Sequence, residues 1–152
     1  MTKPDPRRSV LAGAVVGVGV MAAVDEIVFH QILAWHHFYD RSTHDIALLS
    51  DGLLHAAELV MLVAGGYLLV DLARSRTLHG ASAVGGFFLG AGVFQVFDGL
   101  VNHKVLRVHQ VRYDVEHLLP YDVAWVSAGV VLLAIGVLLT TRAARAADSG
   151  RP

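Results

Sequence analysis

The sequence predicts an all-α integral membrane protein, a four-transmembrane-helix bundle built from two parallel-repeated helical hairpins. Hydrophobic residues make up 55% of the 152-residue chain and charged residues only 16%, whereas a soluble domain carries roughly 25% charged residues. The apolar residues gather in four long stretches, and the same pattern of aspartate and histidine recurs at the ends of two of them. Together these observations indicate lipid as the solvent and two related halves.

Each apolar stretch has the length of a membrane-spanning helix. We expect helices at about residues 9–37, 50–73, 81–107 and 119–143, in a single integral membrane domain that covers residues 1–152. A helix needs about 20 apolar residues to cross the hydrocarbon core. Backbone N–H and C=O groups in lipid must be paired within the segment, so these stretches are helices. The first helix is expected to stay rather than be removed as an export signal, because its apolar residues continue beyond residue 23.

Glycines are frequent within the predicted helices. In the third helix Gly86 and Gly90 form a GxxxG pair. Small residues at this spacing allow helix backbones to approach closely in a membrane. We therefore expect glycines to lie at helix–helix contacts.

The basic residues predict the orientation in the membrane. Eight of them lie before the first helix, between the second and third, or after the fourth: Lys3, Arg7, Arg8, Arg74, Arg76, Arg142, Arg145 and Arg151. The other four lie at the opposite ends of the helices: Arg41, Lys104, Arg107 and Arg112. Cytoplasmic loops carry an excess of Lys and Arg. We expect a protein of the bacterial inner (cytoplasmic) membrane with both termini in the cytoplasm.

A repeat relates the first predicted helix to the third. Residues 24–36 and 97–109 share the frame Asp-x4-His-x2-Leu-x2-His at an offset of 73 residues. The same offset pairs His44 with His117, and a slightly shorter one pairs Asp51 with Asp122. Chance similarity between membrane helices is common for apolar residues and much rarer for an aspartate and two histidines in register. The repeat predicts two hairpins related by an axis along the membrane normal.

Ionisable residues concentrate at the outer end of every predicted helix. They are costly in lipid, so each should face a partner inside the bundle. Asp51, His55 and Glu58 have the i, i+4, i+7 spacing of one helix face. The candidate metal ligands are Asp25, Glu26, His30, His36, His37, His55, Glu58, Asp98, His103, His109 and His117. Three further residues are expected to support these ligands by hydrogen bonds: Asp51, Asn102 and Asp122.

The α-helical period also predicts which candidates share a face. Glu26 and His30 are four residues apart and should lie on one face. Asp98 and Asn102 have the same spacing, and His103 should lie on the adjacent face. These pairs define the expected shape of the site.

The side-chain chemistry favours a transition-metal site at the outer membrane face. The chain has nine histidines and no cysteine, which excludes thiolate ligands. Imidazole and carboxylate suit copper(II), iron and zinc. Eight histidines at one side exceed what one four-coordinate ion needs, so we expect more than one ion per chain, for metal handling or redox chemistry. A net charge of −1 gives no basic field for nucleic acid.

These motifs resemble a family of bacterial multi-pass membrane proteins classed as a domain of unknown function. The resemblance covers nearly the whole chain, although Glu26 stands where the family has glycine. It rests on Asp25, His30, Leu33, Trp35, His36, His37, Asp98, Gly99, Asn102, His103, Leu106 and His109. It implies a four-helix membrane protein without an assigned activity. The family's frequent company with cytochrome oxidase assembly proteins implies copper, and a respiratory oxidase or its assembly factors as partners besides the lipid bilayer.

Two other functions remain open at this point. A membrane metalloenzyme, either a di-iron oxidase or oxygenase or a zinc hydrolase, would use the same histidines and carboxylates. The sequence does not identify catalytic residues for it. A proton or cation pathway would also need buried ionisable groups, but the inner halves of the helices are almost purely apolar and do not continue such a path.

Overall fold

The computed structural model describes residues 3–149, and this range contains four long helical spans and no strand. The first span consists of α1 (Pro6–Val24) and η1 (Asp25–Ile32), and the third of α3 (Gly80–Phe97) and η2 (Asp98–Leu106). The second and fourth are α2 (His44–Arg74) and α4 (Leu119–Asp148). All four spans are long and apolar enough to cross a membrane. The all-α prediction with four spanning helices is confirmed, while Arg151, which the orientation used, lies outside the described residues.

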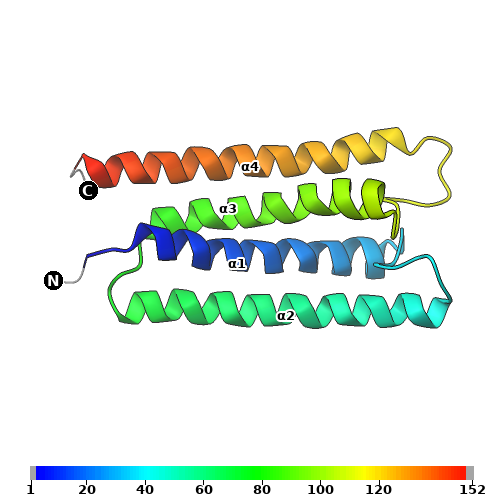
Figure 1. Cartoon of the computed structure of the whole chain (residues 1–152), viewed down its shortest axis with the longest axis horizontal. Coiled ribbons are helices and arrows are strands. Elements are labelled where there is room, and N and C mark those ends of the chain that lie inside the picture. Colours follow the sequence, from blue (N-terminus) through cyan, green and yellow to red (C-terminus); the bar gives the residue numbers. More distant parts are fainter. Residues whose placement is uncertain (1–2, 150–152) are drawn as a thin grey trace.

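The helices lie in a row in the order α4, α3, α1, α2 (Figure 1). α1 packs against α3 in the middle, α2 packs on α1, and α4 packs on α3. The start of α1, the end of α4 and the α2–α3 turn share one end, which we call the terminal end (Figure 1). The connections 33–43 and 107–118 share the other, which we call the loop end. The outer helices expose apolar side chains such as Leu59 and Val130, as expected of surfaces that face lipid.

Glycines bring the two central helices into backbone contact. A Cβ atom added at Gly17 would collide with the carbonyl oxygen of Phe87, and one added at Gly90 would collide with that of Ala14. Two further glycines make the same contact one turn earlier: Gly13 and Gly86. Close packing of small residues is a main source of helix association in lipid. It also brings the polar outer ends of α1 and α3 together.

The parts of the two central spans next to the loop end are π-helical. η1 begins at Asp25 and η2 at Asp98, the aspartate of the repeat in both cases. A π-helix pairs residues five apart, which an α-helix does not. Sequence spacing placed His103 on the face adjacent to that of Asp98, and the structure brings the two into direct contact, with their Oδ2 and Nε2 atoms 2.9 Å apart. The π-helical turn explains this contact and the matching one between Asp25 and His30.

The first span ends earlier than the hydropathy pattern suggested, whereas the third ends at Leu106, close to the expected residue 107. Ala34 and Arg107 occupy corresponding positions of the repeat and both have left-handed backbones, with φ of 49° and 53°. The first span ends at Ile32 instead of residue 37, so His36 and His37 lie in a connection. α2 begins at His44 rather than residue 50, because Thr43 caps it by accepting from the Ile46 N–H. A hydropathy count cannot show this polar first turn.

Backbone contacts recur between the two halves at the offset of 73 residues. The N–H of Trp35 donates to the carbonyl of Phe29 at 2.9 Å, and the N–H of Val108 donates to that of Asn102 at 3.0 Å. The glycine contacts of α1 and α3 obey the same offset. Superposition of the complete hairpins about one axis stays a prediction.

Candidate metal centre

Nine of the buried polar side chains gather at the loop end, around η1 and η2. Each is 9% exposed or less: Asp25, Glu26, His30, His36, Asp51, Asp98, Asn102, His103 and His109. All nine were singled out from the sequence as ligands or as their supports. Ionisable groups withdrawn from water need partners or a cation, so the contacts within this cluster decide what it can bind.

Four imidazole rings form the middle of the cluster. The ring centroids of His30 and His36 are 4.5 Å apart, and those of His103 and His109 are 4.6 Å apart. His36 and His109 stack across the two halves, with centroids 4.7 Å apart and planes at 5°. The same ring contact therefore occurs in each half, and the stacked pair is the closest of the ring contacts that join the halves.

Main-chain carbonyls hold the two stacked histidines. Nδ1 of His36 lies 2.8 Å from the carbonyl oxygen of Val111, and Nδ1 of His109 lies 2.7 Å from that of Phe38. A carbonyl only accepts, so each Nδ1 carries the proton and donates it. In the neutral ring the lone pair is then on Nε2. Neither Nε2 atom has a hydrogen-bond partner among the described residues.

These Nε2 atoms face carboxylates. His36 Nε2 lies 3.9 Å from Asp25 Oδ1, and His109 Nε2 lies 3.5 Å from Asp98 Oδ1. A nitrogen lone pair and a carboxylate oxygen are both hydrogen-bond acceptors, so they repel each other when they face one another. The arrangement becomes favourable when a proton or a metal cation lies between them. The ligand atoms of His36, His103 and His109 lie within 4.8 Å of one another. The cluster therefore directs several nitrogen and oxygen lone pairs toward one position, where a metal ion could bind.

Asn102 fixes the carboxylate of Asp98. Its Nδ2 donates to Asp98 Oδ1 at 2.8 Å, and Nε2 of His103 lies 2.9 Å from the other oxygen. The sequence predicted that Asn102 supports a ligand by a hydrogen bond, and this contact has that geometry. Such a contact limits the directions in which the carboxylate can point.

A second group of ligand atoms lies between η1 and the start of α2. Nδ1 of His30 is 2.8 Å from Glu26 Oε2 and 3.2 Å from Asp51 Oδ1. The other oxygen of Asp51 is 2.6 Å from Nδ1 of His37. The N–H of Phe38 also donates to Asp51 Oδ1, at 2.7 Å. Asp51 thus joins a possible ligand set, whereas the sequence assigned it only a supporting role.

Three predicted site residues lie away from the four imidazoles: His55, His117 and Asp122. His55 has a side chain 49% exposed, and its Nδ1 lies 2.7 Å from Oε1 of buried Glu58. The side chain of His117 is 79% exposed, because it lies in the connection before α4. Asp122 pairs with Lys104 at 2.6 Å. His55, His117 and Asp122 are therefore not brought together with the four imidazoles, whereas Glu58 is itself buried, at 2% exposed.

Burial keeps His36 neutral. The pKa of His36 falls from 6.5 to about 2, first because the ring is buried and then because the imidazoles of His109, His30 and His103 lie nearby. His36 lies in the connection between the first two spans. At ordinary pH its Nε2 lone pair is thus available to a cation rather than occupied by a proton.

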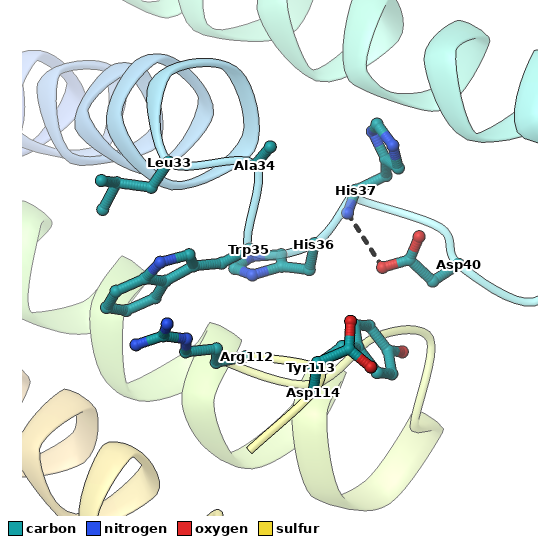
Figure 2. Close-up of a pocket in the computed structure, with 9 residues that line it drawn as sticks. All are labelled: Leu33, Ala34, Trp35, His36, His37, Asp40, Arg112, Tyr113 and Asp114. Atoms are coloured by element: carbon teal, nitrogen blue, oxygen red, sulfur yellow. Dashed lines mark hydrogen bonds between the residues drawn. The ribbon is translucent and has the colours of Figure 1, made fainter.

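A cavity of about 360 Å³ reaches His36 and His37 from the loop end (Figure 2). The Arg112 guanidinium lies on its wall, 4.7 Å from the centroid of the Trp35 ring. Asp40 accepts from the backbone N–H of His37 at 2.9 Å (Figure 2). Because one wall belongs to the cluster, this cavity gives an ion or small molecule a route to its edge.

Sequence reasoning missed the carbonyls of Phe38 and Val111 that orient the stacked rings. A main-chain carbonyl has no residue-specific signal, and both belong to connections whose path periodicity does not set. It also missed Trp125 of α4, which is buried with its ring centroid 5.8 Å from that of His103. Its aromatic character was a signal for a packing role, without indicating this contact.

Comparison with known proteins gives one match. A family model described as "Predicted membrane protein (DUF2243)" matches residues 12–143. This range contains every residue of the buried cluster. No curated protein and no solved structure matches the chain.

Proposed function

We propose that this chain, which belongs to the DUF2243 family of predicted membrane proteins, binds transition metal through the buried histidines and carboxylates of its loop end. One observation carries the proposal. The Nδ1–H groups of His36 and His109 donate to main-chain carbonyls, so two fixed Nε2 lone pairs face Asp25 and Asp98. A cation between them would turn a repulsive arrangement into a set of bonds.

The central site takes its ligands from both halves of the chain. We assign His36, His103 and His109 as imidazole ligands, with Asp98 and Asp25 as the nearest carboxylates. Nitrogen and oxygen ligands without sulfur favour copper(II), iron or zinc. The chain's lack of cysteine supports the same choice. A closed set of this kind suits a protein that holds a metal ion for redox chemistry or transfers it.

The loop end is proposed to face the extracytoplasmic side of a bacterial inner membrane. The support is the excess of basic residues at the terminal end. The cavity beside His36 would then open toward that side and admit metal. Delivery of metal to a respiratory oxidase, or to its assembly factors, is the version of this function that the sequence resemblance favours.

Site-directed labelling should test this orientation. The chain contains no native cysteine, so His44→Cys and Thr77→Cys each give one thiol, at the loop end and the terminal end respectively. In intact cells an impermeant maleimide should label position 44 and leave position 77 unlabelled. Labelling of both positions after the membrane is permeabilised is the control. Labelling of position 77 alone in intact cells would reverse the proposed orientation.

Replacing Asn102 with alanine should weaken metal binding without abolishing it. The variant loses the 2.8 Å hydrogen bond that holds Asp98. Loss of a contact that orients a metal ligand typically costs about 10–100-fold in affinity. Competition with a chelator of known affinity measures the change. An unchanged affinity would show that Asp98 does not ligate the ion.

The cavity supports a metalloenzyme as the second candidate function. A volume of about 360 Å³ beside His36 is room for a small substrate as well as for an ion. An oxidase, an oxygenase or a zinc hydrolase would need an open coordination position on this side. Metal identity separates these candidates, because iron supports oxygen chemistry and zinc supports hydrolysis.

Elemental analysis of the purified full-length protein in detergent tests the proposal, with electron paramagnetic resonance on the same sample. We expect copper, iron or zinc at one or more ions per chain after purification or after incubation with each metal and desalting. A proton pathway would need no metal. Protein that retains none of the three metals under any of these conditions would contradict the proposed function and favour that alternative.

A further inference from the structure

We propose a second divalent-metal site that exists only in the first half of the chain, with Glu26, Asp51 and Nδ1 of His30 as its ligands. This inference deepens the proposed function and rests on it for the metal-binding role of the loop end. The central site joins both halves, whereas the second site lies between η1 and α2.

The second site holds two buried carboxylates beside one imidazole. Glu26 and Asp51 are each 2% exposed, and the ligand atoms of these residues and His30 lie within 4.8 Å of one another. Oε2 of Glu26 is fully buried and lies 2.8 Å from Nδ1 of His30, the third proposed ligand. Its other oxygen accepts from the neutral amide of Gln31 at 2.8 Å. Two carboxylates withdrawn from water in this way call for a cation.

In the second half of the chain, a lysine side chain provides a positive charge near the corresponding position. Lys104 stands 73 residues after Gln31, and its Nζ lies 2.6 Å from Asp122 and 3.3 Å from Gln110. Asp122 corresponds to Asp51 in the repeat. In this half, therefore, an ammonium group is bound at the carboxylate that begins α4.

The first half lacks such a group. Gln31 is neutral where the second half has Lys104, and Glu26 adds a carboxylate where the second half has Gly99. The change removes one positive charge and adds one negative charge at the same place. We therefore expect the first half to bind a metal ion at the position that corresponds to the Lys104 ammonium group in the second half.

A separate cavity gives access to this position. It has a volume of about 430 Å³ and is lined by Glu26, Gln31, Leu48, Asp51, Gly52 and His55. The cavity beside His36 shares none of these residues. An ion could therefore reach the second site without passing through the central one.

The ligand set indicates the class of ion. Two carboxylates and one imidazole form a harder set than the imidazole-rich central site, and they favour Mn²⁺, Fe²⁺ or Zn²⁺. With Nδ1 of His30 as a ligand, its Nε2–H would face Asp25, 3.6 Å away. His37 would remain on the far oxygen of Asp51, at 2.6 Å, and help to orient it.

Replacing Gln31 with lysine tests the second site directly. The new ammonium would mimic Lys104 and compete with a divalent ion for Glu26 and Asp51. We expect the full-length protein, loaded with Mn²⁺, Fe²⁺ or Zn²⁺ and desalted, to hold one ion per chain fewer than wild type. Gln31→Met is the matched control, because it has a similar size and no charge. It loses the 2.8 Å hydrogen bond from Gln31 to Glu26, so its metal affinity should fall, but with metal in excess it should still hold as many ions as wild type. Glu26→Gln removes a proposed ligand and should also lose one ion, which keeps the test valid if Gln31→Lys does not fold.

Other results would overturn the second site. One is a folded Gln31→Lys or Glu26→Gln variant that holds as much metal as wild type. Another is a loss of metal in Gln31→Met as large as the loss in Gln31→Lys. A wild-type stoichiometry of one ion per chain would also do so. The central site is tested separately through His109→Asn. This variant should lose the ion of the central site, whereas Gln31→Lys should keep that ion and lose only the ion of the second site. Failure of both variants to change metal content would contradict the proposed function as well.

Discussion

Replacing His109 with asparagine should remove the central metal ion and leave the protein folded. Asparagine can place its Nδ2–H near the position of Nδ1 and keep the hydrogen bond to the carbonyl of Phe38, which is 2.7 Å long in the wild type. It has no atom that replaces Nε2. Since loss of a supporting contact alone costs about 10–100-fold in metal affinity, loss of the ligand should exceed that range. Metal content after desalting and chelator competition measure it.

The repeat supplies a second form of this test. His36 has the corresponding hydrogen bond to Val111, so His36→Asn should have the same effect. His117→Ala is the control, because the sequence predicted His117 as a ligand whereas the structure leaves its side chain 79% exposed. It should retain the wild-type metal content. Equal loss in all three variants would mean that surface histidines bind the metal.

Replacing Gly90 with alanine should strongly destabilise the protein. The added Cβ would collide with the carbonyl oxygen of Ala14, a backbone atom that side-chain rotation cannot move. Overpacking of a filled contact typically costs about 1–3 kcal/mol, and we expect the upper part of that range here. Thermal unfolding in detergent and the monodisperse fraction in size-exclusion chromatography should both fall. Gly17→Ala should behave alike, because it meets the carbonyl oxygen of Phe87.

Gly66→Ala is the matched control for this prediction. Gly66 lies in α2, and no atom lies within 4 Å of a Cβ added there. Alanine is favoured over glycine within a helix by about 1 kcal/mol, so this variant should be as stable as wild type or more stable. A loss of stability in Gly66→Ala as large as that in Gly90→Ala would show that backbone contact between α1 and α3 is not the cause.

The sequence predicted the four spans and the buried cluster because each depends on residue type and local spacing. Asp25, His30, Asp98 and His103 stood out as costly residues in apolar segments, and the structure buries all four. The contact of Glu26 with His30 was predicted from their spacing of four residues and is present at 2.8 Å, although η1 is π-helical. Hydropathy, residue type and spacing along the chain were sufficient to predict these features.

Features that depend on non-local structure could not be predicted. The π-helical turns at Asp25 and Asp98 change which residues share a face, and an apolar sequence does not distinguish them from α-helix. The connections that fold back over the cluster decide that His36 is buried and that His117 is exposed. Their course follows tertiary hydrogen bonds, such as the one from the N–H of Asp40 to the carbonyl of Val108.

Anomalous X-ray diffraction from crystals of the metal-loaded protein would test the central claim most directly. The account predicts an anomalous peak among the ring nitrogens of His36, His103 and His109, within bonding distance of at least two of these residues. About 2.0–2.1 Å is expected for a zinc–imidazole bond. Peaks confined to exposed histidines such as His55 and His117, with none in the buried cluster, would contradict it.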